Sequence, residues 1–174
     1  MGEEPSVDPA VAAAFLSLYE RALPEVYGYV VKRCGDVSAA EDITSETFLA
    51  AVRALQIGDV VTIGVPWLIG TARHKLADHW RATARGERLQ SALEGEHVEE
   101  EDPWDVTLDR VRAHDVLHEL GDHHRSALTL RYVDGLPVPE VAGLLGRTVH
   151  ATEALLVRAR TAFRTAYEGG GVGA

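Results

Sequence analysis

The amino-acid sequence predicts an all-α protein: two small helical domains joined by a flexible acidic linker. Three observations support this prediction. Apolar residues recur at steps of three and four along most of the chain, whereas no alternating strand pattern of any length occurs. Acidic residues concentrate in one interior segment, and basic residues gather in a helical stretch on each side of it. At 174 residues, the chain is long enough for two small cores.

Composition describes a globular protein rather than a disordered or membrane-spanning one. The chain is 46% hydrophobic and 25% charged, with a mean hydropathy of −0.07. It lacks an apolar run of about 18 residues, so we expect no membrane insertion. The single cysteine, Cys34, cannot form an internal disulfide, and the first residues do not resemble a signal peptide. We therefore expect a cytoplasmic protein.

The net charge of −10 is unevenly distributed. Residues 93–105 hold seven acidic and no Lys or Arg side chains, and residues 1–20 hold four more acids, which leaves +1 for everything else. A like-charged block interrupted by Gly95 and Pro103 is more typical of a solvated linker than of an acidic helix face. The acidity therefore does not exclude a polyanionic partner.

Three or four helices are expected before the linker. Residues 9–33 have helical apolar spacing, with Pro24 expected to kink or split the run. Ser38 and Glu41 form a capping box, which predicts a helix from Ser38 to about Leu55. Its expected inward-facing residues are Ile43, Thr47, Phe48, Ala51 and Leu55.

A long basic, aromatic helix should follow a loop at residues 56–65. Pro66 suits the first helical position, and the helix extends to about residue 88. Cations neutralise phosphates and aromatic rings stack on unpaired bases, so this mixture suits single-stranded nucleic acid. For Trp67 a core position is the preferred interpretation, whereas for Trp80 core and base-stacking roles are more evenly balanced.

Four helices are expected after the linker. An amphipathic helix covers Val106–Leu120, with Val106, Leu108 and Val111 among its apolar residues, and ends at Gly121. Asp122 should cap a second helix that Gly135 ends. A short helix over about Val138–Leu145 ends at Gly146, and the last runs from near Thr148 to about Tyr167.

The last two helices have the pattern of a helix-turn-helix. Small residues, Ala142 and Gly146, stand where two crossing helices must approach. The expected buried face comprises Val149, Thr152, Leu156, Ala159 and Phe163, and the expected exposed face Arg147, His150, Ala151, Glu153, Ala154, Val157 and Arg158. Thr148 can cap the last helix, whose first N–H groups can bind a phosphate. The alternative is an ordinary helical hairpin with a solvated basic face.

Eight histidines raise the question of a metal site, especially His114 and His118 one turn apart. No HExxH motif occurs, no third ligand is fixed by spacing, and Gly121 interrupts the helix before His123. We therefore expect surface histidines, no metal and no cofactor. P-loop, GxGxxG and GxSxG motifs are also missing, so nothing in the sequence requires an enzyme.

Taken together, the motifs resemble those of bacterial extracytoplasmic-function (ECF, group 4) RNA polymerase sigma factors. Residues 40–55, AEDITSETFLAAVRAL, resemble conserved region 2.2. Residues 67–81, WLIGTARHKLADHWR, look like regions 2.3 and 2.4. Residues 120–167, which include LRYVDGL and the RAR of the last helix, are similar to region 4.

The resemblance implies a sigma region 2 domain at 10–90, a linker at 91–106 and a region 4 domain at 107–168. It implies core RNA polymerase and promoter DNA as partners, and an anti-sigma factor that the sequence does not identify. The implied polymerase-binding residues are Asp42, Glu46 and Phe48. The implied −10 element contacts are Arg73, His74, Lys75, Asp78, Trp80, Arg81 and Arg85, and the implied −35 element contacts are Arg147, Thr148, His150, Ala151, Glu153, Ala154 and Arg158.

Several residues depart from the family pattern. Ser45 replaces a usual glutamine, and His74 a frequent asparagine near the −10 strand. Glu153, Ala154 and Leu155 replace a commonly basic or polar trio, so we expect little direct base reading there. Pro137 stands where a capping serine is frequent, so its helix must begin differently.

Two other functions compete with a sigma factor. A stand-alone helix-turn-helix regulator would bind duplex DNA without polymerase, usually as a dimer, and a histidine-rich helical enzyme would bind metal stoichiometrically. Under the sigma-factor interpretation we also hypothesise that the acidic linker repels DNA, or mimics it against basic polymerase surfaces. Neutralising Glu99, Glu100, Glu101 and Asp102 would then raise the DNA affinity of the free protein.

Overall fold

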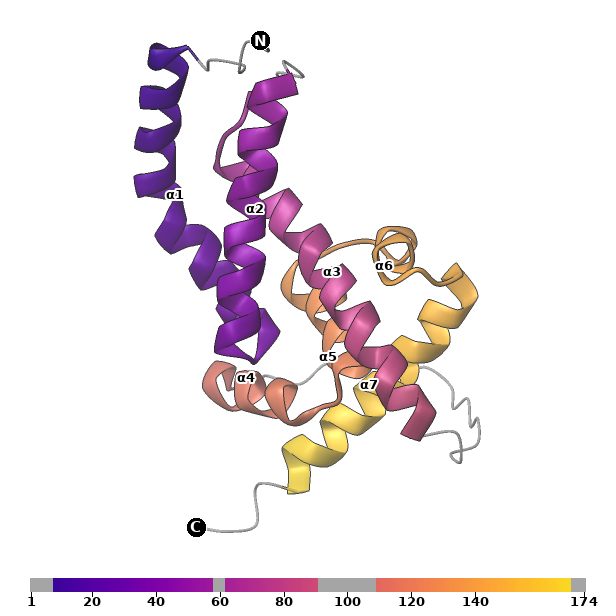
Figure 1. The fold of residues 1–174 in the computed structure, drawn as a ribbon. Helices are drawn as coiled ribbons and strands as arrows, with labels where there is room; N and C mark the ends of the chain where they lie inside the picture. The colour runs from indigo at the N-terminus through magenta and orange to yellow at the C-terminus, as the bar shows by residue number, and fades with distance from the viewer. Residues whose placement is uncertain (1–7, 58–61, 91–108, 170–174) are drawn as a thin grey trace. The chain divides into compact units, whose positions relative to one another are not determined.

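The computed structural model describes residues 8–57, 62–90 and 109–169 (Figure 1). These residues are helical and contain no strand, so the predicted all-α class is confirmed. The elements are α1 Pro9–Cys34, α2 Val37–Ile57, α3 Val65–Gln90, α4 Arg110–Glu119, α5 Asp122–Leu128, the π-helical turn η1 Thr129–Val133, α6 Val138–Leu145 and α7 Val149–Gly169. Residues 93–105, and with them the acidic linker, lie outside the described residues.

Contacts divide the chain into two compact units, Met1–Leu76 and Ala77–Ala174. The division falls inside α3, so the last turns of this helix belong with α4 to α7. We describe each unit by itself. The domain limits of 10–90 and 107–168 stay a prediction.

In the first unit, α1 and α2 form an antiparallel pair joined at Gly35 and Asp36 (Figure 1). The Asp8 carboxylate caps α1, accepting from the Ala10 N–H at 2.8 Å, and Gly35 ends it with a φ of 78°. Pro24 lies inside α1, which continues through it without a break. The predicted inward residues of α2 are buried, except Leu55, which is half-buried.

The predicted capping box at the start of α2 is wrong. The helix begins at Val37, and the carboxylate of Asp36 accepts from the Ala39 N–H at 2.6 Å. Ser38 is therefore already helical, and the helix starts one residue before it. The sequence offers two capping side chains two residues apart, and the structure uses the first.

The start of α3 is close to the prediction. The helix begins at Val65, and the Leu68 N–H donates to the Gly64 carbonyl at 3.0 Å, so Pro66 stands in the first turn, where its missing N–H costs nothing. Leu68, Ala72 and Leu76 are fully buried along one face. Trp67 is only half-buried, which corrects its expected core position. Of the predicted loop 56–65, residues 58–61 lie outside the described residues.

In the second unit, α4 is shorter than predicted. It begins at Arg110, and Asp109 caps it by accepting from the N–H groups of Val111 and Arg112. Val111 is 73% exposed, so its predicted place in the core is wrong. Because Val111 is in the first turn, its side chain projects past the start of the helix, away from the packed neighbours. Val106 and Leu108 lie outside the described residues.

The aromatic ring of Tyr167 attaches α4 to α7. The Arg112 guanidinium lies over this ring at 4.3 Å from its centroid, and the Asp109 N–H donates to the Tyr167 hydroxyl at 3.1 Å. Beneath them, Val116 packs with residues of α5 and α7 in a core cluster that also contains Leu128, Ala159 and Phe163. These contacts position α7, which carries the candidate site.

The region between Gly121 and Gly135 differs in two details from the prediction. Gly121, not Asp122, is the N-cap of α5; Asp122 is the first helical residue and forms an ion pair with Arg125. The predicted helix then continues as the π-helical turn η1. Gly135 ends this turn with a φ of 70°, a left-handed backbone conformation that glycine adopts without steric cost.

Candidate nucleic-acid interface

The helix-turn-helix predicted from the sequence is present in α6 and α7. Gly146 ends α6 with a φ of 62°, and the Arg147 N–H donates to the Ala142 carbonyl at 2.9 Å, which closes the helix end. The Thr148 hydroxyl then accepts from the Ala151 N–H at 3.1 Å and caps α7. Two helices are thus joined by the three residues 146–148, as a helix-turn-helix requires.

The buried face of α7 agrees with the predicted spacing at four positions, Thr152, Leu156, Ala159 and Phe163. Val149 is 43% exposed, so its predicted burial is wrong. As the first helical residue it points its side chain past the helix start. Leu155, one of the three residues that replace a commonly basic or polar trio in the family pattern, is buried instead. This leucine belongs to the core.

The predicted −35 contacts gather on the accessible side of α7 and on the turn before it. Thr148, His150 and Glu153 are exposed, whereas Arg147, Ala151, Ala154 and Arg158 are half-buried. Neither Arg147 nor Arg158 forms an ion pair with any described residue. A phosphate or a base edge can therefore bind either guanidinium group without displacing a carboxylate. Glu153 introduces one acidic side chain into this face.

The predicted −10 contacts all lie on α3, but not on one face. His74, Asp78, Arg81 and Arg85 recur at steps of four, three and four and so share one side of the helix, on which His74, Asp78 and Arg85 are exposed. Trp80 is on another side and is only 1% exposed. With its ring covered, Trp80 cannot stack on a base in this arrangement.

Two of the cations on α3 are already paired. The Lys75 ammonium lies 3.0 Å from the Glu46 carboxylate of α2, and Arg81 forms an ion pair with Asp78 one turn before it. Arg73 donates to the Tyr29 hydroxyl at 3.3 Å. Exposed ion pairs contribute little to stability, so a phosphate can displace such acids at small cost.

Within the unit Ala77–Ala174, the structure brings residues from both predicted DNA-binding sets to one pocket. Arg81 and Arg85 of α3 and Arg147 of the turn all line it, as does Trp80. The remaining lining residues, Ala84, His123, Ser126, Leu145, Gly146 and Leu155, were not singled out from the sequence as site residues. No sequence signal could have found them, because the α3 residues lie far along the chain from His123 and the other lining residues that follow it.

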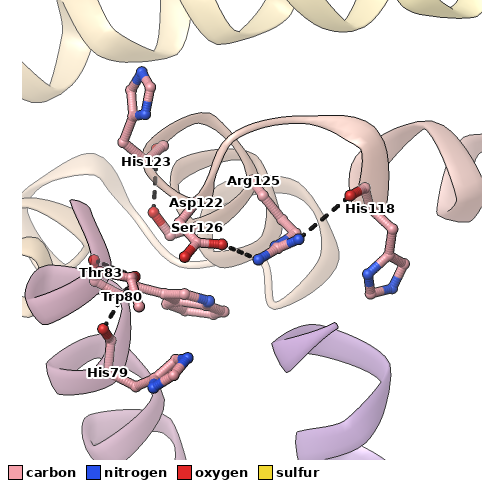
Figure 2. A network of polar contacts seen from close by, with 8 residues as sticks. All are labelled: His79, Trp80, Thr83, His118, Asp122, His123, Arg125 and Ser126. Atoms are coloured by element: carbon pink, nitrogen blue, oxygen red, sulfur yellow. Dashed lines mark hydrogen bonds and ion pairs between the residues drawn. The ribbon is translucent and has the colours of Figure 1, made fainter. Parts of the chain in front are cut away.

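Figure 2 shows the indole of Trp80 reaching from α3 toward Asp122 and Ser126 on α5. On the α5 side, Arg125 pairs with Asp122 and donates to the His118 carbonyl, and the Ser126 hydroxyl donates to the His123 carbonyl at 3.1 Å. The indole Nε1 of Trp80 is buried and has no hydrogen-bond partner among the described residues.

The predicted polymerase-binding residues lie on α2. Asp42 and Glu46 are exposed, whereas Phe48 is 5% exposed and packs edge-to-face against Tyr19 of α1, with ring centroids 4.7 Å apart. The two carboxylates can therefore meet a partner directly, and Phe48 supports the surface from beneath.

The histidine pair that raised the metal question is present but incomplete. The Nε2 atoms of His114 and His118 lie 3.2 Å apart, within hydrogen-bond distance. Within residues 8–57, 62–90 and 109–169, no group of three or more His, Cys, Asp or Glu side chains is arranged to hold a metal ion. The same residues include no helix that is both long and apolar enough to span a membrane.

Comparison with known proteins identifies two regions of the chain, the first of which extends past the boundary between the two compact units. Residues 18–86 match Sigma-70 region 2, and residues 110–163 match Sigma-70, region 4. Among solved structures, the chain is similar to the sigma factor RpoE of Bartonella quintana, solved in complex with the anti-sigma factor NepR. The match covers 89% of this chain and 97% of the RpoE chain. Its TM-score is 0.52 at 18% identity, which is a likeness in fold. A region 2 followed by a region 4 defines a sigma factor.

Two relatives define the family within this class. The chain is 34% identical over 155 residues to the ECF RNA polymerase sigma factor BldN of Streptomyces coelicolor, a match that covers 85% of this chain and 58% of BldN. It is 32% identical over 135 residues to the ECF RNA polymerase sigma factor SigC of Mycobacterium tuberculosis, over 73% of this chain and 69% of SigC. The chain therefore belongs to the ECF RNA polymerase sigma factors.

Proposed function

We propose that this chain binds core RNA polymerase and directs promoter-specific initiation of transcription by recognising −10 and −35 elements. The observation that supports this most strongly is the presence, in one chain and in this order, of a region 2 with exposed basic and polar residues on α3 and a region 4 with an accessible helix-turn-helix. The same order favours a sigma factor over a stand-alone helix-turn-helix regulator.

In region 4, α7 is the recognition helix for the −35 duplex. Arg147 and Arg158 contact phosphates or base edges, and the N-terminus of α7 with Thr148 supports a phosphate contact. Glu153 can accept a hydrogen bond from a cytosine amino group. Ala151 and Ala154 offer small apolar contacts, so shape and phosphate contacts carry much of the recognition.

In region 2, α3 contacts the melted −10 strand. His74, Lys75, Asp78, Arg81 and Arg85 provide cationic and polar groups along the helix, with Arg73 and Trp80 beside them. Extruding a base from the stack costs a few kcal/mol, which a pocket and phosphate contacts can offset. The chain itself performs no chemical step: the polymerase supplies catalysis, and neither metal nor cofactor is needed.

The remaining partner assignments follow from the family. Asp42 and Glu46 contact core polymerase, with Phe48 beneath them. An anti-sigma factor is a further expected partner, as RpoE of Bartonella quintana has one in NepR. The site of action is the cytoplasm, where polymerase and promoter DNA are present.

A reconstituted initiation assay tests the proposal. The purified chain is added to core polymerase and a promoter library, and the transcripts are sequenced. A sigma factor gives discrete start sites that share upstream elements, and none without the chain. Tight operator binding by the free chain, with no polymerase binding, would instead identify a stand-alone regulator.

A further inference from the structure

We propose that His114 and His118 of α4 form a binding site for a divalent transition-metal ion of the zinc, nickel and copper class. The inference goes beyond the proposed function, because neither histidine belongs to the residues assigned to promoter or polymerase contacts. It also differs from the metal-dependent enzyme considered from the sequence, since neither histidine lines the pocket described above.

The separation of the two imidazoles suits a chelated ion. Their Nε2 atoms are 3.2 Å apart. Two metal–nitrogen bonds of about 2.0–2.1 Å place their nitrogen atoms about 2.8–3.0 Å apart at a right angle, and about 3.3–3.4 Å apart at the tetrahedral angle. The observed distance lies between these values. One ion can therefore bind both nitrogen atoms with little movement of either ring.

The nitrogen edges of the two rings face each other. The ring centroids are 4.4 Å apart, farther than the Nε2 atoms, and the ring planes are inclined by 57°. Side chains four positions apart lie on one side of a helix, one turn above the other. The backbone of α4 thus holds the two ligands together before an ion binds.

Asp115 favours the tautomer that metal binding requires. One of its carboxylate oxygens lies 3.9 Å from Nδ1 of His114, so electrostatic attraction favours a proton on that nitrogen. Nε2 of His114 then carries the lone pair that binds a metal. A carboxylate near the other ring nitrogen is a common feature of metal-binding histidines, because it orients the ring and raises the basicity of the ligand.

The donor set selects the kind of ion. Neutral imidazoles suit Zn²⁺, Ni²⁺ and Cu²⁺, whereas Mg²⁺ prefers oxygen ligands. Among the described residues no third His, Cys, Asp or Glu is arranged to join the pair, and the His114 side chain is 49% exposed. Water therefore completes the coordination shell. Two protein ligands are fewer than a structural or catalytic zinc site uses, so the ion binds reversibly and exchanges with solvent.

A bound ion should stabilise the C-terminal turn of α4. This helix has only ten residues, so it depends on its neighbours for stability. The His118 carbonyl accepts from Arg125 of α5 at 3.4 Å, and Figure 2 shows the His118 imidazole pointing away from that guanidinium. Val116, between the two histidines in sequence, packs in the core. Because the unfolded chain does not hold the two rings together, the ion stabilises the folded region 4.

Isothermal titration calorimetry of the full chain, prepared without a polyhistidine tag, tests the site with Ni²⁺, Zn²⁺ and Mg²⁺ as probes. His114→Ala and His118→Ala each remove one ligand. His118→Ala combined with Glu119→His keeps the number of histidines but turns the second imidazole from about 40° to about 140° away from His114 around the helix axis. His124→Ala removes a histidine of α5 and is the control that should keep the site.

We expect the parent to bind one Ni²⁺ or one Zn²⁺ per chain and no Mg²⁺. Each single ligand variant should bind Ni²⁺ about tenfold or more weakly, because even the loss of a group behind a ligand costs about 10–100-fold in metal affinity. The double variant should be as weak as His118→Ala, and His124→Ala should match the parent. No Ni²⁺ binding by the parent, or the same affinity in every variant, would overturn the proposal.

Thermal unfolding followed by circular dichroism gives a second measurement and shows that each variant is helical. Ni²⁺ should raise the unfolding midpoint of the parent and of His124→Ala, and should leave the midpoints of the ligand variants almost unchanged. An equal rise in all the variants would place the ion elsewhere and refute the site. These measurements need neither polymerase nor DNA, so their outcome is independent of the proposed function.

Discussion

Single residues on the two promoter-reading helices have clearly separable roles. Arg147 and Arg158 have no ion pair with a described residue, whereas Lys75 and Arg81 are neutralised by Glu46 and Asp78. A phosphate that binds Lys75 or Arg81 must therefore displace a carboxylate, whereas one that binds Arg147 or Arg158 need not. The sequence shows which cations are present, but not which are paired, because Glu46 and Lys75 are 29 positions apart.

Arg147→Ala should weaken promoter binding by the polymerase-bound chain through loss of a phosphate contact. We expect the slope of log affinity against log salt to decrease in magnitude by about 1, with a similar loss on every promoter sequence. Fluorescence anisotropy over a salt series measures this. Thr161→Ala, at an exposed position on α7, is the control and should keep the slope. An unchanged slope for Arg147→Ala would remove Arg147 from the interface.

Glu46→Gln separates a polymerase contact from an ion pair. The pair with Lys75 is exposed, so its loss should change the free energy of unfolding by less than about 1 kcal/mol. Affinity for core polymerase should nevertheless fall. Lys75→Met breaks the same pair but keeps the carboxylate, and should preserve polymerase affinity. Equal losses in the two variants would mean that the ion pair, and not the Glu46 carboxylate, matters for binding.

At the scale of elements, helix ends are where the sequence predicted least well. Helical periodicity located the inward faces of α2 and α7 except at Leu55 and Val149, which lie near helix ends, because burial repeats with the helical period. Which residue occupies the N-cap depends on the backbone path into the helix, which apolar spacing does not report. At α2 the Asp36 carboxylate, and not the Ser38 hydroxyl, accepts from the Ala39 N–H, and at α5 the N-cap is Gly121, which has no side chain, while Asp122 is already helical.

Asp36→Ala should lower the free energy of unfolding by about 1 kcal/mol, because the α2 cap is lost. Ser38→Ala should have an effect of only a few tenths of a kcal/mol, since that hydroxyl is not the cap. Urea denaturation of both variants followed by circular dichroism measures the difference. A larger loss for Ser38→Ala would restore the capping box.

Two glycines of the helix-turn-helix should respond in opposite directions to alanine. Gly146 has a φ of 62°, so Gly146→Ala should destabilise by about 1–2 kcal/mol. Gly143 is inside α6 with nothing within 4 Å of a built Cβ, so Gly143→Ala should stabilise by about 0.5–1 kcal/mol. Thermal unfolding of the two variants measures both changes in stability. A stable Gly146→Ala variant would show that the turn tolerates another conformation.

At the scale of the whole molecule, the fold class and the two-part organisation were readable from the sequence. Helical period, a charge block and the ordered motifs of regions 2 and 4 are properties of local sequence, and they led to the family. The pocket was not readable, because Arg81 and Arg147 meet only through the packing of α3 with α5, α6 and α7. Trp80 illustrates the limit, since its spacing allowed both a core and a stacking role, and only the fold shows that it is covered.

The central claim is that this chain makes core RNA polymerase promoter-specific through two separate DNA-reading surfaces. Sequencing of the transcripts that core polymerase starts in the presence of the chain tests it most directly. The account predicts start sites that share both a −10 and a −35 element, and that are lost with Arg147→Ala and Arg158→Ala combined. Unspecific initiation that is the same with and without the chain would contradict it.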